Sequence, residues 1–568
     1  MEVSILQLSD NRYKTAVVTK DLAKNFPFSN QRAKQTFVLN EISAAFASGY
    51  KHILLEAPTG FGKSPVAIAA AITLGSSYIC TSTKDLQTQY SKDFSFVKVA
   101  KGKNNFSCAV KQDFIKNGTY KCGLCISNNV NECYHTTADY GPCVGNKEFE
   151  GCGCKYRTFL KDYKISNKGT REEKIVINND AMHHYEKEYS QWLHIKNLKD
   201  HQLTEWKPCE YFDQLNIALV SSHSILNYPI FFALLPNKKV LPSRELLILD
   251  EAHLLETEIV KFRGLAISKR RWKKYIPSLK MVDYGYDDIE KWIDFLIDLE
   301  SKMLDLTGNS SMAQSLSLFR RTKFNWTGKK ASPINKKRIV AASEIFESDE
   351  EIAVKYDMNF FNGSPTISDE LKVEVLRDIE KLTETINSIL SNPKNWIVSD
   401  IKKENYEVTK VEFKPLDTSQ YWKAVFEKCN KTLMMSATIL DSKTFCHSLG
   451  LAPDDVKFIQ VGSDFLVENR PIYPMNIAYL NYNSLQLQEV KTSLSRAIDN
   501  LLTLHRNHKG IIHTTSYEQL NFIKESTTSK SAQTFSNRSR DTKRGSYSRT
   551  YQQYKTNGSN ITIVTYGT

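Results

Sequence analysis

The first hundred residues alternate short apolar runs with amphipathic stretches. Apolar runs at His52–Glu56 and Ser77–Thr81 predict strands, and the longer periodic stretches predict helices over Asn30–Ser48, Val66–Leu74 and Lys84–Phe94. A regular alternation of strand and helix is typical of a parallel sheet covered by helices. The N-terminal part of the chain is therefore predicted to be an α/β domain.

This alternation is interrupted twice before it resumes. Residues 100–210 are rich in Cys, Asn and Lys and are expected to be an insertion, after which strands are predicted at Ile217–Ser221 and Leu246–Asp250. Residues 254–395 instead have a helical period, which predicts helices packed on a core. Two apolar stripes carry this period: Ile289, Trp292, Ile293, Leu296, Leu299 and Met303, and then Leu371, Val375, Ile379, Leu382, Ile386 and Ile389.

Strand-like runs return in the last third of the chain. They lie at Val408–Phe413 and Thr432–Ser436, and then near Ile477–Leu480, Gly510–Thr514 and Ile561–Thr565. A second α/β block is therefore expected after the helical region.

Composition and charge narrow the class of protein. The 568 residues are 41% hydrophobic and 24% charged, as in globular proteins, and the formal net charge is +13. The positive charge favours an anionic partner, nucleic acid before a membrane surface. There is no apolar run long enough to span a membrane and no signal-peptide pattern, so we expect a soluble, intracellular, cytoplasmic protein (nuclear in a eukaryote) without a membrane partner.

Residues 57–64 read APTGFGKS and separate a predicted strand from a predicted helix. This is the pattern of a phosphate-binding loop, in which backbone N–H groups and a helix N-terminus surround phosphate oxygens. Lys63 would reach the β- and γ-phosphates, and the Ser64 hydroxyl would bind Mg²⁺. The nucleotide-binding residues predicted in the loop are Thr59, Gly60, Gly62, Lys63 and Ser64.

The strand at Leu246–Asp250 ends in two carboxylates. Asp250 would provide a second Mg²⁺ contact, and Glu251 would orient and deprotonate the attacking water. His253 would link the nucleotide site to the second lobe. Together with the phosphate-binding loop, this acidic strand end predicts a nucleoside triphosphatase with Lys63, Asp250, Glu251 and His253 as catalytic residues.

The order of these motifs resembles superfamily 2 helicases, specifically the iron–sulfur XPD/DinG-like branch. Arg32–Gln35 resembles the element beside the adenine, which implies that Arg32 and Gln35 bind ATP, and Asp250–His253 resembles the DEAH box. Further segments similar to family motifs are Glu56–Ser64 (the phosphate loop), Thr81–Gln89 (motif Ia, a DNA-backbone contact), Met435–Thr438 (coupling of hydrolysis to lobe movement), Glu468–Pro471 and Gly510–Tyr517.

The resemblance implies two RecA-like parallel-sheet lobes, with the two insertions in the first. The expected first lobe comprises residues 1–100, 211–256 and 406–445, and the second comprises residues 446–568. Residues 101–210 would form a Cys-rich metal-cluster insertion and residues 257–405 a helical, arch-like insertion.

The cysteines are clustered. Eight of the 11 lie between Cys108 and Cys209, and in a reducing compartment this clustering favours a metal site over disulfides. The resemblance implies a [4Fe–4S] cluster on Cys108, Cys122, Cys125 and Cys209. Several alternatives stay open: Cys143, Cys152 or Cys154 in place of the middle pair, zinc in place of iron–sulfur, a second zinc site that includes Cys133 and His135, or buried unligated thiols.

Two stretches combine basic and aromatic residues, namely Lys269–Tyr275 and Arg320–Arg338. Cations can follow a phosphate backbone while aromatic rings stack on unpaired bases, so both stretches are candidates for single-strand binding. The alternative is a solvated helix face with a buried aromatic residue.

The chain ends in Ile561–Thr568, which resembles the opening of motif V, and the arginine-rich motif VI has no match. A truncated second lobe is therefore expected. The function implied is an ATP- and Mg²⁺-dependent helicase that moves 5′→3′ on single-stranded and forked DNA, as a monomer. The alternative is an ATP- and nucleic-acid-binding fragment with a zinc-stabilised insertion and no turnover. RNA remodelling is disfavoured, because DEAH-type RNA enzymes lack this cysteine insertion.

Overall fold

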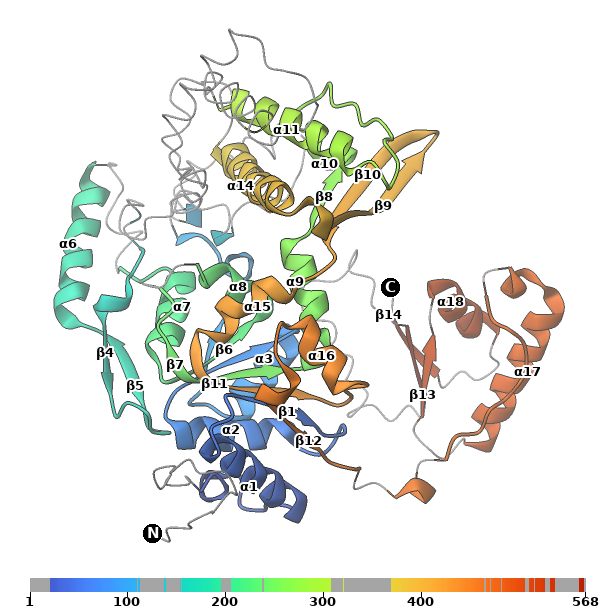
Figure 1. Cartoon of the computed structure of the whole chain (residues 1–568), viewed down its shortest axis with the longest axis horizontal. Helices are drawn as coiled ribbons and strands as arrows, with labels where there is room; N and C mark the ends of the chain where they lie inside the picture. The colour runs from blue at the N-terminus through green and yellow to red at the C-terminus, as the bar shows by residue number, and fades with distance from the viewer. Residues whose placement is uncertain are drawn as a thin grey trace. The chain divides into compact units, whose positions relative to one another are not determined.

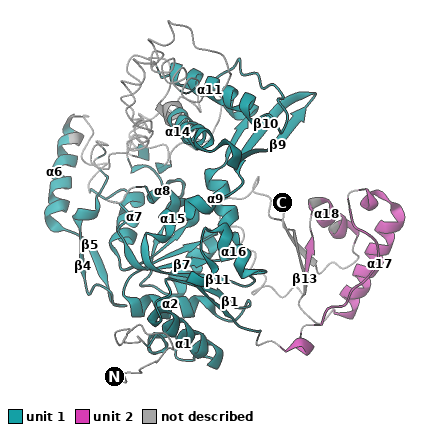
Figure 2. Ribbon diagram, in the orientation of Figure 1, with its two compact units in different colours: residues 1–463 teal, residues 464–568 magenta. Residues whose placement is uncertain are grey.

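The chain divides into two compact units, residues 1–463 and 464–568 (Figure 2). Each unit is described by itself. The computed structural model describes residues 21–109, 111–112, 137–138, 154, 156–195, 206–236, 240–307, 320, 369–463, 466–469, 471–481, 483–505, 510–514, 516–526, 532–536 and 561–565.

The first unit is built on a seven-stranded sheet in which every strand pair is parallel, so the predicted parallel α/β fold is confirmed. Its strand order is β12-β1-β11-β7-β2-β6-β3. The strands are β1 (His52–Glu56), β2 (Ser77–Thr81), β3 (Lys98–Ala100), β6 (His223–Asn227), β7 (Arg244–Asp250), β11 (Cys429–Ser436) and β12 (Val456–Gln460). Only β11 separates β1 from β7, so the ends of these two strands lie near each other.

Helices cover both faces of this sheet, which explains why strands such as β1 and β7 carry apolar side chains on both faces. Successive strand residues point to opposite faces, so Ile53 and Leu55 pack in one core cluster and Leu54 packs in another. Figure 1 shows α1 (Ala33–Ala47) and α2 (Lys63–Leu74) below the sheet. The other helices of this layer system are α3 (Lys84–Asp93), α7 (Glu210–Val220), α8 (Tyr228–Leu234), α9 (Leu255–Arg263), α15 (Ser419–Phe426) and α16 (Ser442–Ser448).

Two strand predictions made from the sequence are wrong, and one strand was not predicted. Residues 217–220 are the end of helix α7, and the strand follows at β6. The apolar run there is the buried face of a helix that begins after Cys209, with Phe212, Leu215 and Leu219 in the core. Residues 477–480 form no strand. Conversely, β12 was not predicted, and it places residues 456–460 in the first sheet rather than in a second lobe that starts at 446.

The helical insertion packs two long helices, α11 (Ile289–Asp305) and α14 (Asp369–Ser391), with an antiparallel sheet of order β8-β10-β9. The strands are β8 (Leu265–Ser268), β9 (Trp396–Glu404) and β10 (Glu407–Pro415), and the short helix α10 (Lys269–Trp272) follows β8. The described residues of the two apolar stripes predicted from the sequence are buried in this core, except Ile289, which is partly buried against it. Because β10 belongs to this sheet, the insertion extends beyond residue 405.

The described part of the Cys-rich insertion contains a hairpin and one long helix. The hairpin joins β4 (Tyr163–Ser166) to β5 (Lys174–Ile177), and α6 (Asn179–Ile195) follows it.

The second unit contains a parallel sheet of order β13-β15-β14 and two helices, α17 (Gln488–Leu504) and α18 (Tyr517–Ser526). The strands are β13 (Gly510–Thr514), β14 (Ala532–Ser536) and β15 (Ile561–Thr565). The strands predicted at Gly510–Thr514 and Ile561–Thr565 are confirmed. In the part of the chain that the structure describes, no helix has the length and apolarity that crossing a membrane requires.

Candidate functional site

The predicted phosphate-binding loop joins the end of β1 to the start of α2, where Lys63 is the first helical residue. Gly60 and Gly62 have φ of 83° and 89°, a left-handed conformation that suits glycine. A Cβ on Gly62 would lie 2.5 Å from Gln35 Nε2, so a larger residue there would force the Gln35 amide to move. Thr59 is exposed and Ser64 half-buried.

Arg32 and Gln35, at the start of α1, brace this loop through its backbone. Gln35 Nε2 donates to Phe61 O at 2.9 Å, and Arg32 donates through its guanidinium to Gly60 O at 2.7 Å. The Arg32 backbone N–H in turn donates to Gln35 Oε1 at 2.9 Å. The element expected to contact adenine therefore also holds the loop in shape, which the sequence did not indicate.

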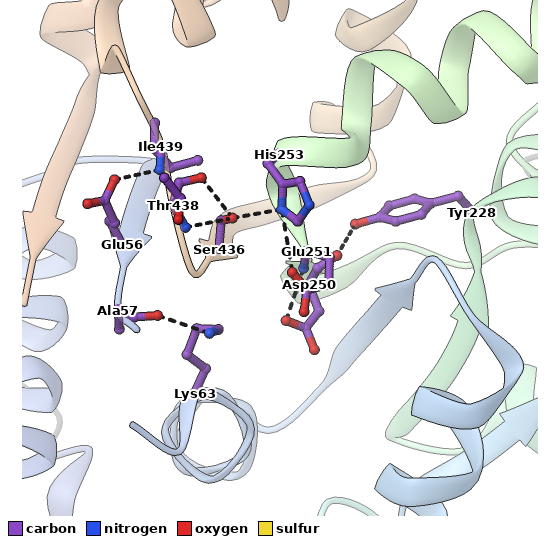
Figure 3. A network of polar contacts seen from close by, with 10 residues as sticks. All are labelled: Glu56, Ala57, Lys63, Tyr228, Asp250, Glu251, His253, Ser436, Thr438 and Ile439. Atoms are coloured by element: carbon purple, nitrogen blue, oxygen red, sulfur yellow. Dashed lines mark hydrogen bonds and ion pairs between the residues drawn. The ribbon is translucent and has the colours of Figure 1, made fainter. Parts of the chain in front are cut away.

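Lys63 begins α2, in the loop-helix segment that follows β1, and Asp250 ends β7 (Figure 3). Strands β1 and β7 both pair with β11. Lys63 Nζ donates to Ala57 O at 2.9 Å. Asp250 is 4% exposed, and burial together with repulsion by Glu251 raises its pKa to about 6, against the opposing effects of Tyr90 and Lys63. A buried carboxylate that is poor in positive partners is an attractive ligand for a hard cation.

Hydrogen bonds fix the orientation of Asp250. Tyr90, from α3, donates its hydroxyl to Asp250 Oδ2 at 3.0 Å, and the Glu251 N–H donates to Oδ1 at 3.0 Å. The Tyr228 hydroxyl donates to the backbone oxygen of Asp250 at 2.7 Å. The contribution of Tyr90 could not be predicted from the sequence, because it depends on how α3 packs on the sheet.

Glu251 has φ of 55°, which is uncommon for a residue with a side chain and stores local strain. This conformation turns the chain out of β7, so that Glu251 Oε2 lies 3.4 Å from His253 Nδ1. His253 Nδ1 is also 2.9 Å from Ser436 Oγ, at the end of β11. His253 thus contacts the Met435–Thr438 segment within the first unit, and its link to the second unit stays a prediction.

Glu56, the last residue of β1, connects three strand ends. Its carboxylate accepts from the Ile439 N–H at 2.5 Å and from Gln460 Nε2 at 2.8 Å, while the next residue, Ala57, donates its N–H to Ser436 O at 3.0 Å. The phosphate loop is therefore tied directly to the segment after β11. The signal available in the sequence was a charged residue that ends an apolar strand.

Of the predicted metal ligands in the Cys-rich insertion, the structure describes Cys108 and Cys209, both buried. Cys209 lies in an aromatic cluster with Tyr156, Tyr185 and Trp206, and the half-buried Cys154 packs against the same cluster. The other candidates lie outside the described residues, namely Cys122, Cys125, Cys133, His135, Cys143 and Cys152. Among described residues, no group of three or more His, Cys, Asp or Glu side chains is arranged to hold a metal ion.

The stretch Lys269–Tyr275 does not form the exposed basic and aromatic surface expected for binding single-stranded nucleic acid. Trp272 and Tyr275 are 2% and 5% exposed and belong to the core of the insertion, so their rings are not available to stack on bases. Three of the cations are paired: Lys269 with Glu407, Arg271 with Asp378, and Lys274 with Glu374.

The second basic stretch is described only at its first residue. Arg320 is 1% exposed and forms an ion pair with Glu300, also buried, so it is part of the core rather than of a DNA-binding surface. Residues 321–338 lie outside the described residues.

Comparison with known proteins gives one family match and several similar structures. Residues 29–204 match the family described as "Type III restriction enzyme, res subunit". No curated protein matches the chain.

Among solved structures, "XPD_Helicase" is 12% identical with a TM-score of 0.42, over 95% of this chain and 81% of that one. "Structure of S. tokodaii Xpd4" is 13% identical with a TM-score of 0.39, over 94% of this chain and 80% of that one. "Truncated XPD" is 12% identical with a TM-score of 0.35, over 76% of this chain and 100% of that one.

Proposed function

We propose that the chain is an ATP-dependent DNA helicase of superfamily 2, similar to the XPD/DinG-like branch. The observation that carries the proposal is the meeting of two motifs at one edge of one parallel sheet. The loop that contains Lys63 and Ser64 follows β1, and the Asp250–Glu251 pair follows β7, with only β11 between them. Ligands of open α/β sheets bind outside the carboxyl ends of the strands, at such an edge.

Each residue of this edge has a proposed role. The loop N–H groups and Lys63 hold the ATP phosphates, with Arg32 and Gln35 bracing the loop and contacting the adenine side. Ser64 and Asp250 hold Mg²⁺, and the burial that raises the pKa of Asp250 fits a site for a hard cation. When bound, the ion would neutralise charge that develops on the phosphates.

Glu251 orients and deprotonates the attacking water, and its contact with His253 sets the direction of its carboxylate. His253 then passes the state of the nucleotide to the Met435–Thr438 segment through Ser436, 2.9 Å away. Closure of the two lobes on ATP, reopening on hydrolysis, and 5′→3′ movement on single-stranded DNA follow from the motif resemblance alone.

For the metal insertion we propose a [4Fe–4S] cluster held by Cys108, Cys122, Cys125 and Cys209, with zinc as the alternative. The burial of Cys108 and Cys209 fits thiolate ligands shielded from water. Cys154 packs against the aromatic cluster that contains Cys209, so it stays a competitor for a middle position. Anaerobically purified protein would be brown with the cluster and colourless with zinc. If the favoured set is right, the colour would be lost in Cys125→Ser and kept in Cys154→Ser.

The test of function is ATP hydrolysis with and without single-stranded DNA. We expect stimulation by DNA in the parent chain and a loss of at least about a hundredfold in Lys63→Ala and Glu251→Gln. Glu251→Gln should still bind Mg²⁺-ATP, because its proposed role is in the chemical step. Lys423→Ala removes an exposed lysine of the same unit and should behave like the parent chain.

Each other outcome has a definite meaning. Hydrolysis at full rate without nucleic acid would reject the helicase assignment. Salt-sensitive DNA binding and ATP binding without turnover would instead support the non-hydrolysing, zinc-stabilised alternative.

A further inference from the structure

Helix α3 reaches the candidate Mg²⁺ site through a single buried side chain. Tyr90, near its C-terminal end, is 1% exposed and donates its hydroxyl to Asp250 Oδ2 at 3.0 Å. Ser64 also lies close enough to interact with this hydroxyl. The two residues proposed to hold Mg²⁺ therefore share a neighbour that belongs to neither motif.

The tyrosine is held as a neutral donor. Burial, followed by the charge of Asp250, raises the pKa of Tyr90 well above its usual value. Its ring lies 6.0 Å from the ring of Phe94 on the same helix, which packs in the core below the sheet. Because Asp250 is buried, few other donors can replace this hydroxyl if α3 moves, and a lost hydrogen bond there is costly.

The first half of α3 is tied to the segment that leads into the Cys-rich insertion. Gln87 is fully buried and donates through Nε2 to Ala100 O at 3.1 Å, and Lys84 Nζ donates to Asn105 Oδ1 at 2.8 Å. Thr83 caps the helix by accepting from the Leu86 N–H at 3.3 Å. Gln87 and Tyr90 are three positions apart in this helix, so less than one turn separates the two contacts and a displacement at one is felt at the other.

We propose that Tyr90 is a positioning residue that couples nucleic-acid binding at α3 to the hold of Ser64 and Asp250 on Mg²⁺-nucleotide. This inference rests on the proposed function, because it assumes that α3 contacts nucleic acid and that the loop binds ATP. A shift of α3 by a fraction of an ångström lengthens the bond from Tyr90 to Asp250 and changes the orientation of a metal ligand. The coupling is reciprocal: DNA changes the affinity for Mg²⁺-ATP by the factor with which Mg²⁺-ATP changes the affinity for DNA.

The test measures this coupling factor in the full chain. Mg²⁺-ATP affinity is determined by calorimetry in a Glu251→Gln background, with and without an oligo-thymidine single strand. We expect the strand to change the affinity by about fivefold or more. In Tyr90→Phe the factor should fall below about twofold, while the variant still binds both ligands.

A matched control is Tyr78→Phe. Tyr78 is fully buried in β2 and donates to Pro242 O at 2.7 Å, so its substitution also removes one buried hydroxyl but should leave the coupling intact. A second probe is Gln87→Met, which cuts the bond to Ala100 about one turn before Tyr90. It is expected to fold, because Gln87 Oε1 has no hydrogen-bond partner among the described residues and the side chain is similar in size. It should lower the coupling factor as Tyr90→Phe does.

The outcomes separate the two proposals. If the parent binds no Mg²⁺-ATP, the proposed function fails. If it binds but DNA has no effect, or if Tyr90→Phe keeps the full coupling, this inference is overturned and the ATP site stands. Should Tyr90→Phe not fold, the coupling factor of Gln87→Met decides, and an unchanged factor rejects the inference.

Discussion

The nucleotide site and the helical insertion handle charge in opposite ways. At the end of β7, two carboxylates are adjacent, Asp250 has a pKa raised to about 6, and Glu251 has a strained backbone. In the insertion, Arg271 pairs with Asp378, and Arg320 pairs with Glu300. Like charges brought together cost stability and mark a place for a ligand, whereas opposite charges brought together complete a core.

The largest effect is expected from removing one charge of the buried Arg320–Glu300 pair in the insertion. Arg320→Met would leave the Glu300 carboxylate buried without its positive partner, and among the described residues only the hydrogen bond from Thr383 would remain. It would also remove the hydrogen bond from Arg320 to Asn387. We expect a loss of about 3–5 kcal/mol in unfolding free energy, measured by denaturant titration. Mg²⁺-ATP affinity should stay unchanged, since these residues belong to the insertion core.

The double variant Arg320→Met with Glu300→Leu serves as the control. Replacing both charges by apolar groups should recover much of the loss. If Arg320→Met alone were as stable as the parent, the pair would not be the buried structural element inferred from its 1% and 2% side-chain exposure.

A smaller effect is expected at the amino ends of the strands in the seven-stranded sheet, opposite the strand ends that carry the candidate site. His223 begins β6, and burial, followed by the charge of Arg244, lowers its pKa to about 4. The folded protein keeps this ring neutral, whereas the unfolded chain protonates it below about pH 6.5. Stability should therefore fall as pH drops from 6.5 towards 4, by about 2 kcal/mol between pH 7 and pH 5 from this group alone.

Urea titrations of the parent and of His223→Gln at both pH values measure this contribution. The variant should show a shallower pH dependence, because a glutamine does not titrate. Identical pH dependence in the two proteins would mean that His223 is not held neutral by the fold.

The smallest effect is predicted for the paired surface of the insertion. Lys269→Ala removes the partner of Glu407, which is 68% exposed, so the unfolding free energy should change by less than about 1 kcal/mol. Affinity for single-stranded DNA should change less than about twofold, measured by fluorescence anisotropy at two salt concentrations. A large loss of affinity with a smaller salt dependence would make this stretch a phosphate contact and remove the contrast between the two regions.

The parts of the fold that could be predicted are those specified by local pattern. The strand at His52–Glu56 was predicted to its residue bounds, because the phosphate loop follows it directly. The strand predicted at Ile217–Ser221 was wrong because a helix buried on its sheet side ends in an apolar run, as α7 does at Ala218 and Leu219.

The residues of the candidate site also divide into those that local sequence could predict and those that it could not. The loop and the acidic strand end were predictable because each is contiguous in sequence. The roles of Glu56, Tyr90 and Gln460 were not, since their partners lie 160 to 404 residues away and depend on strand order. For the stretch Lys269–Tyr275, composition alone did not reveal that acids 100 or more residues later complete the pairs.

The packing of Gly62 against Gln35 links two positions that a comparison of sequences would treat as separate. Even a methyl group at 62 would displace the amide of Gln35, and with it the bond to Phe61 that keeps the loop bent. A larger residue at 62 would therefore need both a left-handed backbone and a new position for the Gln35 amide. Glycine at 62 is expected wherever a glutamine at 35 supports the loop.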